Sequence, residues 1–253
     1  ELNVGLDSVV FIDDNPYERD HVKSTLADVT VPDWPDDKTQ YVMSLSNLRC
    51  FDTLGVADED RVRTDMYQDR KKREGAKNQV GSIEKWLNSL DTTMLVEKLN
   101  SKNLLRSQQL MNKTNQMNLS TRRMTDQEIL SWAKSEENQF WTVRIRDKFG
   151  DLGISGIISC TSKKAHIELV DFILSCRVIG RKIEEMMINF IIEYAHKQKA
   201  EKLSIKYLKT SRNNPCLLFL NELFPDYKIN ENEYLIEYPF KVNFPECISL
   251  EKK

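Results

Sequence analysis

The residues best suited to chemistry lie in the stretch Ser-Cys-Arg-Val-Ile-Gly-Arg-Lys at 175–182. An apolar strand pattern at 166–174 precedes this stretch and an amphipathic run at 183–196 follows it, so Cys176 falls at a strand-to-helix junction. The start of a helix offers unpaired backbone N–H groups and a partial positive charge, which favour a phosphorylated ligand and stabilise a nearby thiolate. The pattern therefore indicates an anion-binding turn beside a nucleophile.

A second polar stretch, residues 109–123, carries side chains suited to holding a substrate. Its amides offer donors and acceptors to hydroxyl and amide groups, and its guanidinium groups pair with phosphate or carboxylate. We expect a substrate wall beside the Cys176 turn. The alternative is a capped helix end with a solvated loop, in which Thr125 is the N-cap of the next helix. The predicted substrate-binding residues are Asn112, Lys113, Thr114, Asn115, Gln116, Arg122 and Arg123.

Cys176 itself has two interpretations. It is a nucleophile whose thiolate is stabilised by the helix start, Arg177 and Arg181, or it is a small buried residue that ends a strand. Its general base is unassigned, because His166 lies ten residues earlier on the same strand, roughly 33 Å away along an extended chain. Asp151, in a glycine-containing hairpin turn, is the better orienting carboxylate, although a turn-forming role explains it equally well.

Composition sets broad limits on the class of protein. The chain has 253 residues, of which 40% are hydrophobic and 30% charged, as in an ordinary globular protein. No apolar run approaches the roughly 20 residues that span a bilayer, so we expect a cytoplasmic protein without a membrane span. Five cysteines without Cys-x-x-Cys or Cys/His spacing argue against a disulfide framework or a zinc site.

The net charge of −2 conceals two oppositely charged parts. Residues 1–60 hold 14 acidic and 4 basic side chains, a balance of −10, so the remainder carries about +8. The acidic part, around Asp13 and Asp14, suits a cation, and the basic part suits an anionic partner such as a coenzyme or a carrier-protein phosphopantetheine. The alternative is solvated surface charge without a ligand. Nothing in the charge pattern indicates a nucleic-acid partner.

Hydrophobic periodicity predicts a two-part organisation. The first part is a βαβ-type fragment with strands at 8–12 and 29–31 around a helix at 17–26, followed by an exposed linking helix at 57–80 and a short helix at 82–90. The second part is an α+β domain with a central, mostly antiparallel sheet. Its predicted strands are 93–99, 140–146, 154–160, 166–174 and 202–207 with a hairpin at 227–242, and its predicted helices are 103–115, 126–135, 183–196 and 215–224.

That order of elements, with a glycine turn between the fourth strand and the third helix, resembles the GNAT acyltransferase fold. In that family the turn holds the pyrophosphate of coenzyme A with backbone amides. The matching residues are Arg177, Gly180 and Lys182, and Lys182 departs from the small residue of the family pattern. The resemblance implies that the cofactor-binding residues are Arg177, Val178, Gly180, Arg181, Lys182 and Asn213.

The whole chain resembles the FkbH-like proteins, which join a HAD-type phosphatase domain, Rossmann-like in fold, to a GNAT-like domain. The residues that carry the resemblance are 10–19, 112–116, 121–123, 149–151 and 175–181, with Thr210 and Asn213. Members of that family take a glyceryl group from a phosphorylated three-carbon donor, hold it as a thioester on a cysteine and pass it to an acyl carrier protein. The resemblance implies such a role in secondary-metabolite or surface-polysaccharide biosynthesis.

The resemblance also implies the domain boundaries. Residues 1–56 match the C-terminal part of the HAD-like domain, 57–90 form a helical linker, and 91–253 form the GNAT-like domain. Asp13 and Asp14 match the acidic pair that helps to hold Mg²⁺ in a complete HAD domain. The nucleophile motif that HAD enzymes need upstream does not occur before residue 13, so we expect a fragment without phosphatase activity. A helix-capping Asp-Asp-Asn-Pro turn is the alternative to a metal site.

Three functional hypotheses follow. The first is acyl transfer of the FkbH-like kind, with Cys176 as transient acyl carrier and Asp151 as orienting group. The second is direct N-acetyl transfer from acetyl-CoA to an amino sugar, as in ordinary GNAT enzymes, which needs no cysteine. The third is a non-catalytic module that docks a carrier protein.

Overall fold

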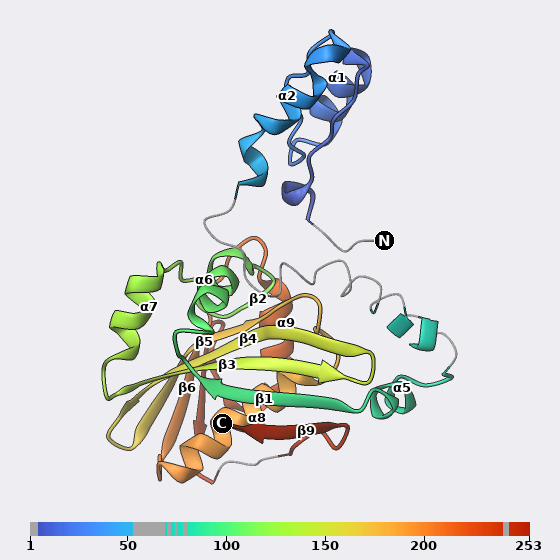
Figure 1. Cartoon of the computed structure of the whole chain (residues 1–253). Coiled ribbons are helices and arrows are strands. Elements are labelled where there is room, and N and C mark those ends of the chain that lie inside the picture. The colour runs from blue at the N-terminus through green and yellow to red at the C-terminus, as the bar shows by residue number, and fades with distance from the viewer. Residues whose placement is uncertain (1–4, 53–68, 70–71, 74, 78–79, 240–242) are drawn as a thin grey trace. The chain divides into compact units, whose positions relative to one another are not determined.

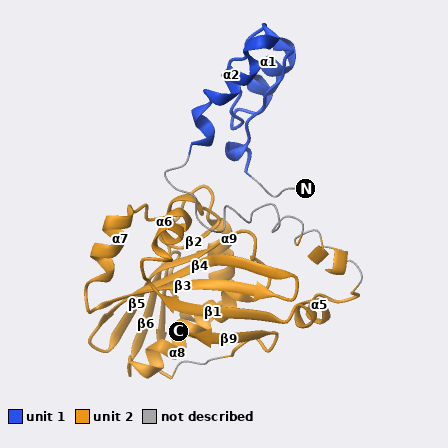
Figure 2. Ribbon diagram, viewed as in Figure 1, with its two compact units in different colours: residues 1–56 blue, residues 57–253 orange. Residues whose placement is uncertain are grey.

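The computed structural model describes residues 5–52, 69, 72–73, 75–77, 80–239 and 243–253. The chain divides into two units, residues 1–56 and 57–253 (Figure 2). The expected linking helix at 57–80 lies largely outside the described residues. Of its described part, Arg73 is 2% exposed rather than on the surface. The prediction of an exposed helix is therefore wrong at Arg73, because a long-range ion pair buries this side chain.

The first unit is built from short elements. Its helices are α1 (Pro16–Thr25) and α2 (Tyr41–Ser46), with 3-10 turns at Leu6–Ser8, Lys38–Gln40 and Arg49–Phe51. Helix α1 begins where predicted, because the Asn15 side chain accepts from the Tyr17 amide at 3.0 Å and Pro16 fits the first helical position. The strands predicted at 8–12 and 29–31 are wrong, since they amount to one isolated parallel bridge between Val10 and Thr30.

The second unit is organised around one mixed sheet (Figure 1). Its strands are β1 (Thr92–Lys98), β2 (Met117–Asn118), β3 (Asn138–Asp147), β4 (Gly150–Lys163), β5 (His166–Leu174), β6 (Lys202–Lys206), β7 (Lys228–Asn230), β8 (Glu233–Glu237) and β9 (Ile248–Lys252). Its helices are α5 (Ile83–Ser89), α6 (Leu104–Lys113), α7 (Asp126–Ala133), α8 (Ile183–Lys197) and α9 (Asn214–Leu223).

The strands run in the order β7-β8-β6-β5-β4-β3-β1-β9, and β2 pairs with β5 outside this path. Most pairs are antiparallel, whereas β1 with β9 and β5 with β6 are parallel. This is the predicted α+β domain, and its sequence of helices and strands is that expected of a GNAT-like domain. The sequence patterns missed β9, and they missed β2 because its two residues are too few to show a period.

Two hydrophobic clusters cover the two faces of the sheet. One cluster joins the sheet to α8 and α9 through residues such as Met187, Ile191 and Leu220. The other joins it to α6 and α7 through Met111 and Ile129. The sheet is thus covered by helices on both faces, which fixes the ends of its strands and the loops that follow them.

Candidate functional site

The turn at 175–182 is fixed at both of its ends. Strand β5 is buried up to Leu174, and the Ser175 amide donates to the Ser155 carbonyl of β4 at 2.7 Å. Val178 is completely buried and anchors the middle of the turn. Gly180 has a φ of 76° and Lys182, the N-cap of α8, has a φ of 63°. These left-handed residues reverse the chain into the helix, and glycine meets this need without steric cost.

Cys176 is exposed, so the alternative of a buried strand-ending cysteine does not describe it. Cys160 and Cys216 are buried, and burial raises the pKa of each thiol to about 12, which keeps both in the unreactive thiol form. Within the part of the chain that the structure describes, the Cys176 thiol has no hydrogen-bonding partner that could serve as its base. Accessibility therefore distinguishes Cys176 from the core cysteines, and its role as a nucleophile stays a prediction.

The structure brings the two polar stretches of the sequence together. Strand β2 pairs antiparallel with the end of β5, with Met117 opposite Leu174 and Asn118 opposite Ile173. The Leu119 amide then donates to the Phe172 carbonyl at 3.1 Å. Strand β6 pairs with β5 from His166 to Leu169. Strand β2 pairs with the later part of the same edge of β5, which β6 leaves open. The pair Met117 and Leu174 thus lies two residues before Cys176 along β5.

Within this polar stretch, buried residues shape the loop. Asn118 is completely buried, donates to the Thr114 carbonyl at 2.9 Å and accepts from the Thr121 amide at 2.8 Å. The Asn112 amide donates to the carbonyls of Gln108 and Met124, at 2.9 and 2.7 Å. These contacts give Asn112 a structural role in addition to the predicted role in substrate binding.

Other side chains of the stretch face outward. Lys113, Gln116 and Arg123 are exposed, and Thr114 and Asn115 are partly exposed. Arg123 donates to the Asn115 side chain, which braces both residues. Lys113 and Gln116 are therefore accessible to a ligand, and their role in substrate binding stays a prediction.

Arg122 forms an ion pair that the sequence did not reveal. Its partner is Asp171 of β5, which is completely buried and also accepts from the hydroxyls of Ser120 at 2.6 Å and Ser159 at 2.5 Å. The Arg122 guanidinium lies 5.0 Å from the centre of the Trp132 ring. Arg122 thus ties the loop to the sheet beneath it. An acidic residue inside the apolar strand pattern 166–174 was the available signal for this site.

Asn213, predicted to bind cofactor, is also completely buried. Its side-chain oxygen accepts from the Tyr207 hydroxyl at 2.6 Å and from the backbone amide and the hydroxyl of Thr210 at 2.8 and 2.9 Å. Its nitrogen donates to the carbonyls of Asn118 at 3.0 Å and Leu208 at 2.8 Å. All hydrogen-bonding positions of the amide nitrogen are used, so Asn213 joins the chain after β6 to β2 instead of presenting a free amide to a cofactor.

A buried ionic cluster holds the other end of the cysteine turn. The side chain of Asp147, at the end of β3, is completely buried and pairs with Arg73 at 2.5 and 2.8 Å and with Arg181 at 3.1 Å. The Asp147 side chain also accepts from the Phe149 amide at 2.9 Å. Because Arg181 is 9% exposed and bound to Asp147, it positions the turn more readily than it contacts a ligand.

A carboxylate of the chain itself reaches the predicted anion-binding amides. Glu184, in the first turn of α8, is 5% exposed and accepts from the Gly180 amide at 2.7 Å. Burial raises the pKa of Glu184, although hydrogen bonds from backbone amides and the charge of Arg181 oppose this rise. A phosphate at this turn must use the remaining first-turn amides or replace the Glu184 carboxylate.

The surroundings of the turn otherwise fit a pyrophosphate. Gly180 is exposed, and a Cβ atom added there would meet no atom within 4 Å, so its surface is open to a ligand. Lys182 is exposed and Arg177 is partly exposed, which leaves two cations at the rim of the turn. The cationic residues therefore fit the phosphate part of coenzyme A, with Glu184 as an internal competitor for one amide.

Asp151 does not contact Cys176. Its carboxylate pairs with Arg144 at 2.9 Å and Arg146 at 3.4 Å and accepts from the Gly153 amide at 2.7 Å. It precedes Ser155, the partner of Ser175, by four residues, or roughly 13 Å of strand. These contacts give it the role of a turn former on the β3–β4 hairpin, and its predicted catalytic role has no supporting contact.

Asp13 and Asp14 lie in the turn before α1. The Asp13 carboxylate accepts from the backbone amide of Asn15 at 2.8 Å. The backbone carbonyl of Asp13 accepts from the Arg19 guanidinium at 2.8 Å. Across residues 5–52 and the other described ranges, no three His, Cys, Asp or Glu side chains converge in a way that could hold a metal ion. The described residues do not by themselves complete a Mg²⁺ site, and the capping turn accounts for Asp13 and Asn15.

No protein-family model matches the chain, and no curated protein matches it. Solved structures do show a likeness. A domain from Methanocaldococcus jannaschii is 16% identical, with 58% of this chain and 99% of that chain covered and a TM-score of 0.45. A GNAT-family acetyltransferase from Staphylococcus aureus is 12% identical, with 57% and 98% covered and a TM-score of 0.42.

The spermidine N-acetyltransferase from Vibrio cholerae, solved with CoA and spermine, is 14% identical, with 57% and 95% covered and a TM-score of 0.40. Identities and TM-scores this low carry no information on substrate. The GNAT-like character of the domain rests on its order of elements. In the described part of the chain, no helix has the length and apolar character needed to cross a membrane.

Proposed function

We propose that residues 91–253 form an acyltransferase domain that works at the junction of β2, β5 and α8. The observation that carries this proposal is the pairing of β2 with the end of β5, which sets the amide-rich stretch beside the exposed Cys176. A reactive thiol, polar side chains and a cationic glycine turn then share one surface. Acyl transfer through a cysteine thioester would use all three, and direct transfer from acetyl-CoA would use the polar side chains and the cationic turn.

Coenzyme A or the phosphopantetheine of a carrier protein would supply the acyl thioester. Lys182 and Arg177 would bind its phosphate groups, and the amides of the first turn of α8 would complete the anion site. Lys113 and Gln116 would contact the acyl group or the acceptor. In this arrangement Arg181 and Arg122 act as positioning residues through Asp147 and Asp171.

Two routes remain for the acyl group. The absence of a base beside Cys176, within the described residues, favours direct N-acetyl transfer to an amine, which needs no cysteine. The exposure of Cys176 supports the second route, in which the thiol holds a glyceryl-like group and delivers it to an acyl carrier protein. For that route residues 1–56 would belong to the HAD-like domain that recruits the phosphorylated donor and Mg²⁺.

Intact mass spectrometry separates the routes. The full chain is incubated with acetyl-CoA, and CoA release is followed with glucosamine or a phosphopantetheinylated carrier protein as acceptor. Cys50 is exposed in the first unit, so Cys50→Ala is the matched control for Cys176→Ala. An acetyl adduct that disappears only in Cys176→Ala establishes that this thiol accepts an acyl group, as the thioester route requires, whereas CoA release to the acceptor that survives this change establishes direct transfer.

Two further outcomes bear on the proposal itself. Binding of acetyl-CoA without an adduct or CoA release in any variant would indicate a non-catalytic module. If isothermal titration detects binding of neither CoA nor a phosphopantetheinylated carrier protein, the acyltransferase proposal is wrong.

A further inference from the structure

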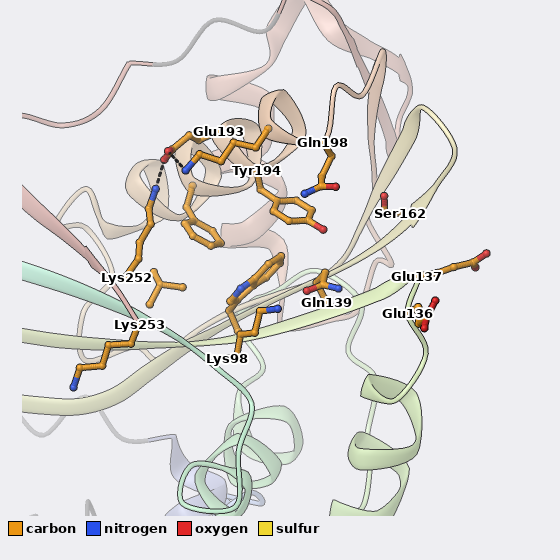
Figure 3. A pocket seen from close by; sticks show the side chains of 14 residues that line it. Lys98, Glu136, Glu137, Gln139, Ser162, Glu193, Tyr194, Gln198, Lys252 and Lys253 are labelled. Carbon is orange, nitrogen blue, oxygen red and sulfur yellow. Dashed lines mark hydrogen bonds and ion pairs between the residues drawn. The ribbon is translucent and has the colours of Figure 1, made fainter.

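A cavity of about 580 Å³ lies on the face of the sheet that α8 covers (Figure 3). Its size is within the range of sites for small molecules. It is lined by the C-terminal half of α8, which begins roughly 10 Å along the helix axis from the turn. None of the residues assigned above to acyl transfer lines it.

The strand register explains the floor of this cavity. Lys98 of β1 is directly opposite Trp141 of β3, and Val96 of β1 is paired with Lys252 of β9. Residues two apart on a strand point to the same face, so Val96 joins Lys98 and Gln139 joins Trp141. The sheet thus presents an indole flanked by lysine and amide side chains toward α8.

Helix α8 supplies the opposite wall. Phe190, Glu193, Tyr194 and Lys197 recur at the three- and four-residue spacing of one helix face. The Trp141 ring meets Phe190 and Tyr194 edge to face, with centroids 5.2 and 4.9 Å apart. Interlocked rings of this kind form a rigid apolar surface that suits a flat ligand.

Charges of opposite sign border the apolar surface. Figure 3 shows Lys252 and Lys253 at one end and Glu136 and Glu137 at the other, with Lys98 between them. Lys252 is bound to Glu193, which also pairs with Lys197 at 2.8 Å. Among the described residues, Lys98, Glu136 and Glu137 form no ion pair. Charges left uncompensated on both sides of an aromatic floor are available to a ligand with complementary charges.

We propose that this cavity binds a small zwitterionic molecule with a flat apolar body. Its anionic group lies toward Lys98 and the lysine end, and its ammonium group lies toward Glu136 and Glu137. The body packs against the partly exposed Tyr194 ring, which the buried Trp141 and Phe190 rings hold in place. The site is separate from the acyl-transfer turn, so ligand binding here does not depend on Cys176.

Three matched probes test the proposal: 4-(aminomethyl)benzoate, which carries both charges, 4-methylbenzoate, which carries only the anion, and 4-methylbenzylamine, which carries only the cation. Binding to the full chain is measured by isothermal titration and by protein NMR shifts. We expect a low-millimolar Kd for the zwitterion, as for other ligands of this size. Each singly charged probe should bind about fivefold more weakly, since one partly exposed ion pair contributes about that factor.

Variants assign the two ends. Lys98→Met keeps an apolar stem but removes the positive charge. It should weaken binding of the zwitterion and of the benzoate and leave binding of the benzylamine unchanged. The double variant Glu136→Gln, Glu137→Gln should weaken binding of the zwitterion and of the benzylamine and leave binding of the benzoate unchanged. Cys176→Ala is the control and should change none of the three. All of these side chains are exposed, so the fold is retained, which thermal unfolding checks.

Three results would overturn the proposal. The first is no binding of any probe in the millimolar range, which would make the rim charges a solvated surface. The second is equal affinity for all three probes, which would indicate an apolar site without charge recognition. The third is loss of binding in Cys176→Ala, which would place the ligand at the turn. None of these results bears on the acyltransferase proposal, because its test uses CoA.

Discussion

The first unit buries one hydrophobic side chain among its described residues, Val29, whereas the second encloses its sheet between two hydrophobic clusters. In the first unit Tyr17, Val42, Met43 and Phe51 are 83%, 78%, 61% and 59% exposed. Its helices are held by caps and short turns, such as the Asn15 cap. The contrast shows that caps and turns can form helices without a hydrophobic core. A domain that folds by itself needs such a core for its stability.

The largest expected effect comes from separating the units. Residues 57–253 should unfold in one cooperative transition, because the sheet and its helices share their clusters. Residues 1–56 by themselves should show no cooperative transition, since they bury too little apolar surface to offset chain entropy. Circular dichroism during heating measures both. A cooperative transition in the short fragment would contradict the contrast between the units.

A smaller effect follows from changing one carboxylate in each unit. Asp147→Asn leaves Arg73 and Arg181 buried without their charge partner, and should lower the free energy of unfolding of the second unit by about 3–5 kcal/mol. Asp13→Asn changes an exposed turn, so it should change the free energy of unfolding by no more than about 0.5 kcal/mol. Urea unfolding gives both values. Similar losses in the two variants would remove the distinction between buried and exposed acids.

Helix caps give a finer comparison. Thr125 and Glu128 form a capping box at α7, so Thr125→Ala should cost about 1 kcal/mol of the free energy of unfolding of the second unit. Asn15→Ala removes the cap of α1 and should reduce local helicity without moving the main transition. Hydrogen exchange at the first-turn amides measures the local effect. A shift of the main transition by Asn15→Ala would mean that α1 belongs to the same cooperative core.

The smallest expected effect is a pH dependence within the second unit. Burial raises the pKa of Glu184 above its usual value of 4.5, so the folded state holds this proton more tightly than the unfolded state. Its contribution to stability is complete below pH 4.5 and is lost as the pH rises through the raised pKa. Glu128 behaves oppositely, because hydrogen bonds from Thr125 lower its pKa and its contribution is lost as the pH falls.

Glu184→Gln measures this dependence. In chemical denaturation from pH 4 to 7, the variant should lack the decline in stability that the unchanged protein shows above pH 4.5, and Glu128→Gln should retain it. The same variant keeps an oxygen that can accept from the Gly180 amide but removes the negative charge that repels a phosphate there, so its affinity for CoA should rise. A steeper decline in Glu184→Gln would show that another group causes the pH dependence.

Except for β2 and β9, the sequence by itself determined the order of helices and strands in the second unit, and it also determined the glycine turn before α8. Both depend on local patterns, the period of apolar residues and the conformational freedom of Gly180. Strand β5 begins and ends where predicted. The same method failed at 8–12 and 29–31, since an apolar run becomes a strand only where a neighbouring strand supplies hydrogen bonds.

Only the tertiary structure decided what the polar residues do. The pairing of β2 with β5 placed the 109–123 stretch beside Cys176, and β9 joined β1 from more than a hundred residues away along the chain. Buried Asp147 and Asp171 form ion pairs with Arg181 and Arg122, two arginines that the sequence predicts to bind ligands, and their binding role stays a prediction. Such partners lie far apart in sequence, and burial makes each charge depend on a partner that no local pattern specifies.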